Sequence, residues 1–302
     1  MVSVFKKDDV IICGDDVYGG TNRLLNKVFG KFGFEIRMVD FSSPKWKEAV
    51  DERVKLIMIE TPTNPTLKVF DIQEISEFAR SKNIWTVVDN TFATSYLQSP
   101  ILLGADAVLH SCTKYIGGHS DCIGGAITTS NTEFYQKIRF NLLSMGGCMS
   151  PFDAYIFLRS LKTLKVRVIQ HCKNARAVVE YLNNHPKVAR VTYPGLESHP
   201  QHEIAKKQMR DFGGMITIYI KGGLEQTNTF LKSVKIFTCA ESLGGVESLI
   251  ECPALMTHMS VPPEQRKILG IDDSLVRLSI GIEDAEDLIR DLDQALAKIK
   301  LD

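Results

Sequence analysis

The chain has 302 residues, which is enough for one large core or two smaller ones, and two domains are the better expectation. Basic and acidic residues balance at 36 each without a basic cluster, which argues against nucleic acids and anionic membranes as partners. No apolar run is long enough to cross a bilayer, and the first ten residues lack the apolar core of a signal peptide.

Short apolar runs alternate with helical patterns through the first half of the chain. We expect strands at residues 10–13, 35–39, 56–59, 84–89, 107–109 and 124–129. Helical patterns lie between them, at 24–29, 46–50, 71–81 and 132–143. Fully apolar strands are typical of parallel strands that are covered on both faces. The alternation therefore predicts an α/β fold with a mainly parallel, doubly wound sheet.

The second half reads as a smaller α/β unit that follows a long helical stretch. A capping box with proline at 150–153 opens that stretch, which should reach residue 184. Such a helix commonly bridges two domains, so we place a large domain at 1–165 and a small C-terminal domain at 166–302. Strands are expected at 188–193, 215–220, 248–250 and 276–280, and helices around 202–210, 224–233 and 285–299.

Lys114 follows a short buried strand, where the chain enters a Gly117-Gly118 turn. Burial favours the neutral amine, which can condense with an aldehyde. The hydroxyls of Ser111 and Thr113 alternate along the chain and so point to one side, where they could donate to a phosphate. Asp89 ends the preceding strand, at the same ligand-binding edge. An aldehyde, a phosphate and a carboxylate for a ring nitrogen together indicate pyridoxal phosphate (PLP).

Other polar residues have competing explanations. Arg277 lies inside an apolar strand, where a charge is costly unless a structural carboxylate or a ligand pairs it. Its planar guanidinium suits an α-carboxylate. His199 and His202 flank a proline without acidic support, which predicts a surface loop and no metal site. Seven scattered cysteines without a CxxC pair indicate reduced thiols that pack the core of a cytoplasmic protein.

Six motifs together resemble the Cys/Met-metabolism family of PLP enzymes, which includes cystathionine γ-lyase and cystathionine γ-synthase. They are DDVYGGTNR at 15–23, ETPTNP at 60–65, VVDNTF ending at 92, SCTKYIGGHSD at 111–121, AESLGGVESL at 240–249 and VRLSIGIED at 276–284. The resemblance implies an aspartate aminotransferase-like fold of PLP-dependent fold type I. It also implies PLP as cofactor, an amino-acid substrate and a homotetramer.

The resemblance assigns roles to the cofactor-binding positions. Lys114 would bind PLP and move protons, assisted by Tyr18, which stacks on the ring. Asp89 would hold the ring nitrogen, and Ser111 and Thr113 would bind the phosphate.

A second group of residues would meet the substrate. Asn64 would bond the cofactor's phenolic oxygen or the substrate carboxylate, and Arg277 would bind the α-carboxylate. Ser242 and Leu243 would line the same pocket. Glu241 would do so as well, although a solvated loop glutamate is an alternative for it.

The implied reaction is γ-elimination of cystathionine to cysteine, 2-oxobutyrate and ammonia. Methionine γ-lyases typically carry a cysteine two residues after the stacking tyrosine, where this chain has Gly20. β-Lyases usually differ around SLGGVESL, whereas cystathionine γ-synthase shares all the motifs and stays open.

The resemblance also implies a family chain that is longer at its N-terminus by roughly a quarter. That part carries a phosphate-binding turn and an arm that reaches the neighbouring subunit. We therefore expect weak PLP binding, low activity and an impaired tetramer. A fragment, an incomplete gene model, or an inactive paralogue that acts as a binding or assembly partner are the alternatives.

Overall fold

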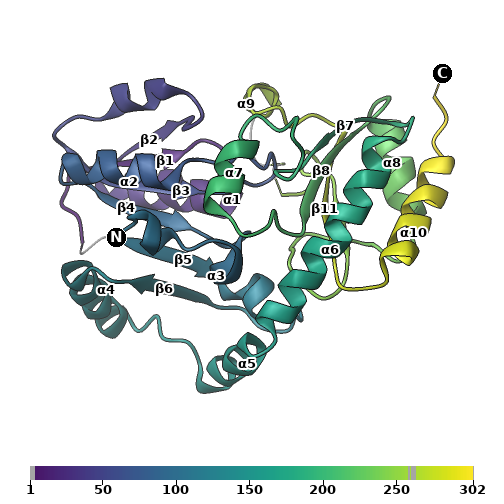
Figure 1. Cartoon of the computed structure of the whole chain (residues 1–302). Helices are drawn as coiled ribbons and strands as arrows, with labels where there is room; N and C mark the ends of the chain where they lie inside the picture. Colours follow the sequence, from purple (N-terminus) through teal and green to yellow (C-terminus); the bar gives the residue numbers. More distant parts are fainter. Residues whose placement is uncertain (1–3, 258, 260–262, 302) are drawn as a thin grey trace.

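Two β-sheets lie side by side in the computed structural model, which describes residues 4–257, 259 and 263–301 (Figure 1). The larger sheet has the order β2-β1-β3-β4-β5-β6. Its first five strands are parallel, and the edge strand β6 runs antiparallel to β5. The bounds are β1 Val10–Gly14, β2 Glu35–Val39, β3 Val54–Glu60, β4 Trp85–Asp89, β5 Ala107–Ser111 and β6 Gly125–Thr129. The predicted mainly parallel α/β sheet is confirmed.

Helices cover both faces of this sheet because its central strands are apolar on both sides. Helix α2 (Ile72–Ser81) packs Ile72 and Ile75 on one face, and Asp71 caps it by accepting from Glu74 N at 3.0 Å. The helical segments α1 (Gly19–Arg23), η1 (Leu24–Val28) and α4 (Thr132–Met145) lie over the other face. Short helical turns complete this half, namely η2 Phe29–Phe32, η3 Pro44–Ala49, α3 Thr94–Leu97, η4 Pro100–Leu103 and η5 Cys112–Ile116.

The expected single helical stretch from 150 to 184 is wrong, because it divides into α5 (Pro151–Leu161) and α6 (Leu164–Asn183). At the break the Ser160 carbonyl accepts from Thr163 Oγ1 at 3.1 Å and from Arg167 Nη2 at 3.0 Å. These side-chain donors satisfy a carbonyl that a continuous helix would bond to an amide four residues on. The proposed domain boundary near residue 165 falls in the first turn of α6 and stays a prediction.

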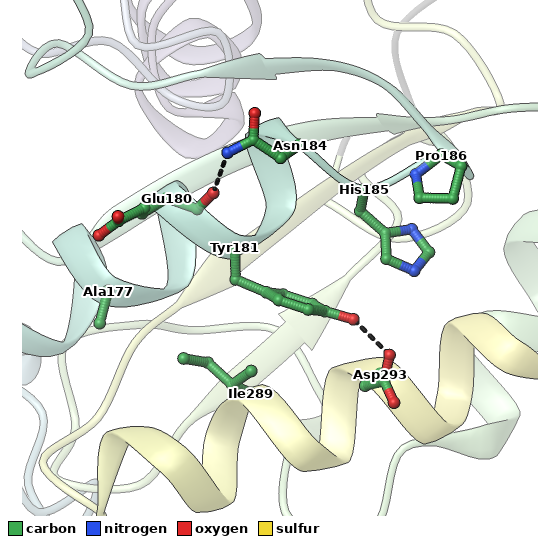
Figure 2. Close-up of a pocket in the computed structure, with 8 residues that line it drawn as sticks. All are labelled: Ala177, Glu180, Tyr181, Asn184, His185, Pro186, Ile289 and Asp293. Carbon is green, nitrogen blue, oxygen red and sulfur yellow. Dashed lines mark hydrogen bonds between the residues drawn. The ribbon is translucent and has the colours of Figure 1, made fainter.

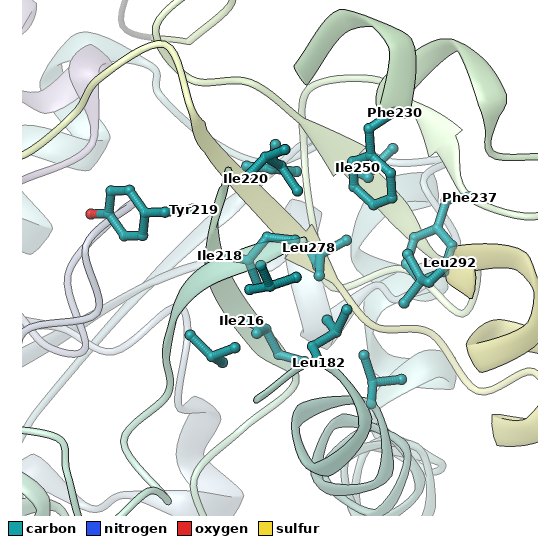
Figure 3. Close-up of a cluster of buried hydrophobic side chains, with 14 of the residues drawn as sticks. Leu182, Ile216, Ile218, Tyr219, Ile220, Phe230, Phe237, Ile250, Leu278 and Leu292 are labelled. Atoms are coloured by element: carbon teal, nitrogen blue, oxygen red, sulfur yellow. The ribbon is translucent and has the colours of Figure 1, made fainter. Parts of the chain in front are cut away.

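The smaller sheet has the order β7-β8-β11-β10-β9. Its strands are β7 Val188–Thr192, β8 Met215–Ile220, β9 Thr238–Cys239, β10 Leu249–Glu251 and β11 Leu275–Ser279, of which β9 was not expected. Helix α10 (Ala285–Ala297) packs against α6 and α8 (Leu224–Ser233), while α7 (His202–Gln208) and α9 (Pro263–Ile268) are shorter. Figure 3 shows the resulting core, in which Ile218 and Leu278 of the sheet meet Leu292 of α10.

Hydrogen bonds join the two halves along the segment that follows β3. Thr217 Oγ1 of β8 donates to the Pro65 carbonyl at 2.6 Å, and Gln208 Nε2 donates to the Phe70 carbonyl at 2.9 Å. His199 Nε2 donates to the Leu67 carbonyl at 3.1 Å from a buried position. The expected surface loop is therefore wrong for His199, whose ring serves as a tether because it can reach a carbonyl of the other half.

The described residues carry neither a helix long and apolar enough to cross a membrane nor a histidine, cysteine and carboxylate group that could hold a metal ion. All seven cysteines lie within the described ranges and have free thiols. Cys148 and Cys239 are exposed, so these two do not pack the core as expected.

Candidate active site

A pocket of about 470 Å³ lies where the carboxyl ends of β3, β4 and β5 face the smaller sheet. All ten residues to which the sequence analysis gave a place at the site line it, namely Tyr18, Asn64, Asp89, Ser111, Thr113, Lys114, Glu241, Ser242, Leu243 and Arg277. Glu60, Thr91, Phe92, Ile123, Gly124 and Thr257 complete the lining. The structure thus brings together residues that are distributed over the whole length of the chain.

Lys114 lies three residues beyond the end of β5, at a kink in η5 where its backbone is not helical. Its Nζ donates to Ser242 Oγ at 2.8 Å. Burial lowers the pKa of the Lys114 amine, and the nearby Arg277 charge lowers it further. The neutral amine is therefore more accessible than in an exposed lysine, as a nucleophile or proton acceptor requires.

Asp89 ends β4, and the residue two positions later fixes its carboxylate. Oδ1 accepts from Thr91 N at 3.0 Å and from Thr91 Oγ1 at 2.5 Å. Burial raises the pKa of Asp89, and these two donors oppose that effect because they stabilise the charged form. Thr91 Oγ1 also accepts from Ser111 N at 2.9 Å, which ties the turn to β5. Sequence reasoning missed Thr91, although Asp followed by Thr two residues later is a turn pattern.

Glu60 is a second carboxyl group that the sequence analysis left without a role. It ends β3 in direct register with Asp89, and its Oε2 accepts from Tyr18 N at 2.9 Å. Burial, followed by the neighbouring Asp89, raises the pKa of Glu60 well above its usual value. A charged residue directly after the apolar run at 56–59 was the available signal.

Arg277 is buried and takes partners from three segments. Nη1 lies 2.9 Å from Glu251 Oε1 and donates to Asn64 Oδ1 at 3.0 Å. Nη2 donates to the Ser242 carbonyl at 2.5 Å. Arg277 is 2% exposed and Glu251 is fully buried beside it on β10, so a structural carboxylate compensates the arginine. Glu251 was missed, because only the β10–β11 register shows that the two residues are neighbours.

The loop at 240–245 supplies the remaining side of the pocket. Ser242 has a φ of 86°, in the left-handed region, and joins Lys114 to Arg277 through its hydroxyl and carbonyl. Glu241 lines the pocket from an exposed position.

The Thr113 hydroxyl accepts from Gly124 N at 3.0 Å and donates to Gly124 O at 3.3 Å. These two bonds to Gly124 hold the hydroxyl in place at the pocket.

These residues fit PLP. Asp89 is a buried carboxylate whose Oδ1 is fixed by two donors, which suits a protonated ring nitrogen. Lys114 supplies an amine with a lowered pKa, and Ser111 and Thr113 place hydroxyls on the same cavity. Tyr18 contributes an aromatic ring to the lining.

A second hollow, of about 580 Å³, lies at the surface between α6 and α10 (Figure 2). Tyr181 spans it and donates through its hydroxyl to Asp293 at 2.6 Å. Its eight lining residues include neither lysine nor arginine, so they offer no amine for an aldehyde and no cation for a phosphate. We therefore assign the chemistry to the smaller pocket around Lys114.

Comparison with known proteins agrees with this assignment. Residues 1–297 match the family model described as Cys/Met metabolism PLP-dependent enzyme. Cystathionine gamma-lyase of Dictyostelium discoideum is 52% identical over 98% of this chain and 76% of that protein. Cystathionine beta-lyase of Lactococcus lactis is 50% identical over 99% of this chain and 78% of that protein. The solved structure of cystathionine gamma synthase from Xanthomonas oryzae superposes with a TM-score of 0.95 at 43% identity, covering 98% of this chain and 77% of that one.

The ion pair behind the pocket generates a stability prediction. Glu251→Ala leaves the buried Arg277 charge without its carboxylate, and we expect the free energy of unfolding to fall by about 3–5 kcal/mol. Urea denaturation followed by circular dichroism measures the loss. Glu241→Ala is the matched control, because Glu241 is exposed and should change stability by less than about 1 kcal/mol. Equal, small effects of both substitutions would contradict a structural role for Glu251.

Proposed function

Since this chain belongs to the Cys/Met-metabolism family of PLP-dependent enzymes, we propose that it cleaves cystathionine by γ-elimination. With one water, cystathionine gives cysteine, 2-oxobutyrate and ammonia. The fold is that of PLP-dependent enzymes of fold type I, the cofactor is PLP, and the enzyme is a carbon–sulfur lyase. The observation that carries the proposal is the hydrogen bond from Lys114 to Ser242, whose carbonyl in turn holds Arg277.

In this proposal each side of the pocket holds one part of PLP. Lys114 would hold the carbonyl carbon of PLP, Asp89 its ring nitrogen, and Ser111 and Thr113 its phosphate, while Tyr18 would cover the ring. When bound, PLP supplies an electrophilic carbonyl and a conjugated ring that takes up negative charge from the substrate. Thr91 keeps the Asp89 carboxylate oriented through two hydrogen bonds to Oδ1.

Lys114 moves protons in this mechanism. Its Nζ takes the proton from the substrate's α-carbon, which requires the neutral amine that burial favours. Ser242 Oγ directs the amine by accepting from it, and the Tyr18 hydroxyl assists with proton transfer when the sulfur leaves the γ-carbon. Phe92 and Leu243 add apolar walls that limit water around these groups.

Arg277 orients the substrate by binding its α-carboxylate, in the proposed role. Glu251 and the Ser242 carbonyl fix the guanidinium plane before the substrate arrives, which reduces the entropy lost on binding. Asn64 accepts from Nη1 and brings its own amide into the same pocket, where it can bond the phenolic oxygen of PLP or the carboxylate. Glu241 lines the exposed edge, where the distal end of a long substrate would extend.

The assignment of Lys114 has a direct chemical test. Reduction of the PLP-loaded protein with borohydride, followed by peptide mapping, should place the pyridoxyl group on Lys114. Lys68, which lies near Asp15 and Asp40 in the same half of the molecule, is an internal control and should stay unlabelled. A label on another lysine would remove Lys114 from the mechanism.

The reaction is tested by comparing products from one preparation. We expect 2-oxobutyrate and cysteine from cystathionine to form faster than cystathionine forms from an O-acylated homoserine and cysteine. Faster γ-replacement would assign the chain to the synthase class. Formation of pyruvate and homocysteine from cystathionine would instead indicate β-elimination, the reaction for which the Lactococcus lactis relative is named. If PLP binds and no product forms, the alternative of an inactive binding partner is favoured.

We also propose a homo-oligomer in the cytoplasm. Large apolar side chains at Phe152, Tyr155 and Leu158 stand at a spacing of three along α5 and are mostly exposed. An apolar surface of this kind favours a protein partner, and a second copy is the simplest one.

Light scattering on the purified protein should give a mass above 33.8 kDa. Leu158→Glu should lower that mass, because it places a charge in the proposed contact. Lys173→Glu, at an exposed position on α6, should leave it unchanged. A monomer that has the mass of one chain, or equal masses for both variants, would contradict the proposed contact.

A further inference from the structure

We propose that Glu60 is a positioning residue that keeps a proton beside Asp89 and holds Tyr18 against the pocket. The inference rests on the proposed function only in that the pocket is taken to bind PLP. It adds a group that neighbours the Asp89 carboxylate and also accepts a hydrogen bond from the Tyr18 amide.

The sheet register places two carboxyl groups side by side. Glu60 and Asp89 are paired residues at the carboxyl ends of the parallel strands β3 and β4, and both line the pocket. Glu60 is 5% exposed and Asp89 is 8% exposed, so water screens neither group well. Two adjacent carboxyl groups in a dry site do not both ionise, and one of them retains a proton.

The hydrogen bonds indicate which group keeps the charge. Asp89 Oδ1 accepts from both the amide and the hydroxyl of Thr91, whereas Glu60 accepts one bond, from Tyr18 N. Donors stabilise the anion, so the charge is better satisfied on Asp89. The buried Asp16 adds negative charge near Glu60, which outweighs the more weakly felt Arg277. The raised pKa of Glu60 agrees with a protonated side chain there.

The same carboxyl group anchors the tyrosine. Tyr18 precedes α1 and its side chain is 50% exposed, so packing alone holds it weakly. Its amide donates to Glu60 Oε2 at 2.9 Å, which fixes the start of α1 to the end of β3. The ring lies over Gly20, where a Cβ atom would collide with it. Glu60 thereby fixes the backbone of Tyr18 at the pocket.

Substitutions at Glu60 separate the two parts of this role. In Glu60→Ala the Tyr18 amide loses its acceptor, and we expect the dissociation constant of PLP to rise about tenfold or more. Glu60→Gln remains neutral and retains a carbonyl oxygen for Tyr18 N–H, so it should recover most of that loss, to within about threefold of wild type. Asp89→Asn, which removes the charge itself, should weaken PLP by at least about tenfold. Titration followed by PLP absorbance gives all three constants.

Kinetics supply a readout that general destabilisation would not produce. With cystathionine, Glu60→Ala should lower kcat more than it raises KM, because the displaced tyrosine acts in proton transfer and does not bind the carboxylate. Glu60→Gln should lie between Glu60→Ala and wild type in kcat. A rise in KM alone would overturn the proposed link to Tyr18.

The outcomes decide the proposal in each direction. PLP binding by Glu60→Gln that is as weak as in Asp89→Asn would show that Glu60 contributes a negative charge, which overturns the protonated assignment. Wild-type affinity in Glu60→Ala would overturn the positioning role. Circular dichroism checks that each variant folds, and if Glu60→Ala does not, the comparison of Glu60→Gln with Asp89→Asn still decides. PLP titration needs no substrate, so failure of the cystathionine assay would leave this test intact.

Discussion

Ionisable groups that are withdrawn from water determine how this pocket is built. Lys114, Asp89 and Arg277 must all be charged or reactive at the seam between two sheets, where desolvation penalises every charge. Each is therefore supplied with fixed partners before any ligand binds. Ser242 receives the lysine, Thr91 the aspartate and Glu251 the arginine. These pairings constrain the path of the chain, because the segments that carry Ser242, Thr91 and Glu251 must all reach the boundary between the two sheets.

The sequence predicted the larger sheet well because its central strands are apolar on both faces. Asp89 and Lys114 could be placed at one edge before the structure was known, since parallel strands carry their carboxyl ends to the same side. The roles given to Tyr18, Asn64 and Ser242 came from resemblance, and the structure brings these residues into one pocket. Periodicity alone would have left them as ordinary turn residues.

The features that were missed depend on contacts between distant segments. Glu251 and Arg277 are 26 positions apart, and only antiparallel pairing of a three-residue strand with β11 makes them neighbours. At the break before α6, Arg167 donates to the Ser160 carbonyl and also to the carbonyls of Tyr115 and Ile116, which lie 52 and 51 positions earlier in the chain. His199 looked like a loop residue because its acceptor, the Leu67 carbonyl, lies 132 positions away. Local patterns predict elements, whereas such bonds depend on how the elements are assembled.

Ser242, a single residue with a left-handed backbone, joins the Lys114 amine to the Arg277 guanidinium. The hydroxyl and the carbonyl of Ser242 belong to the same residue, so a shift of this loop would displace the partners of the Lys114 amine and the Arg277 guanidinium together. In the proposed mechanism this couples substrate binding to proton transfer, so a change of substrate preference would have to come from other sides of the pocket, such as the exposed Glu241 edge.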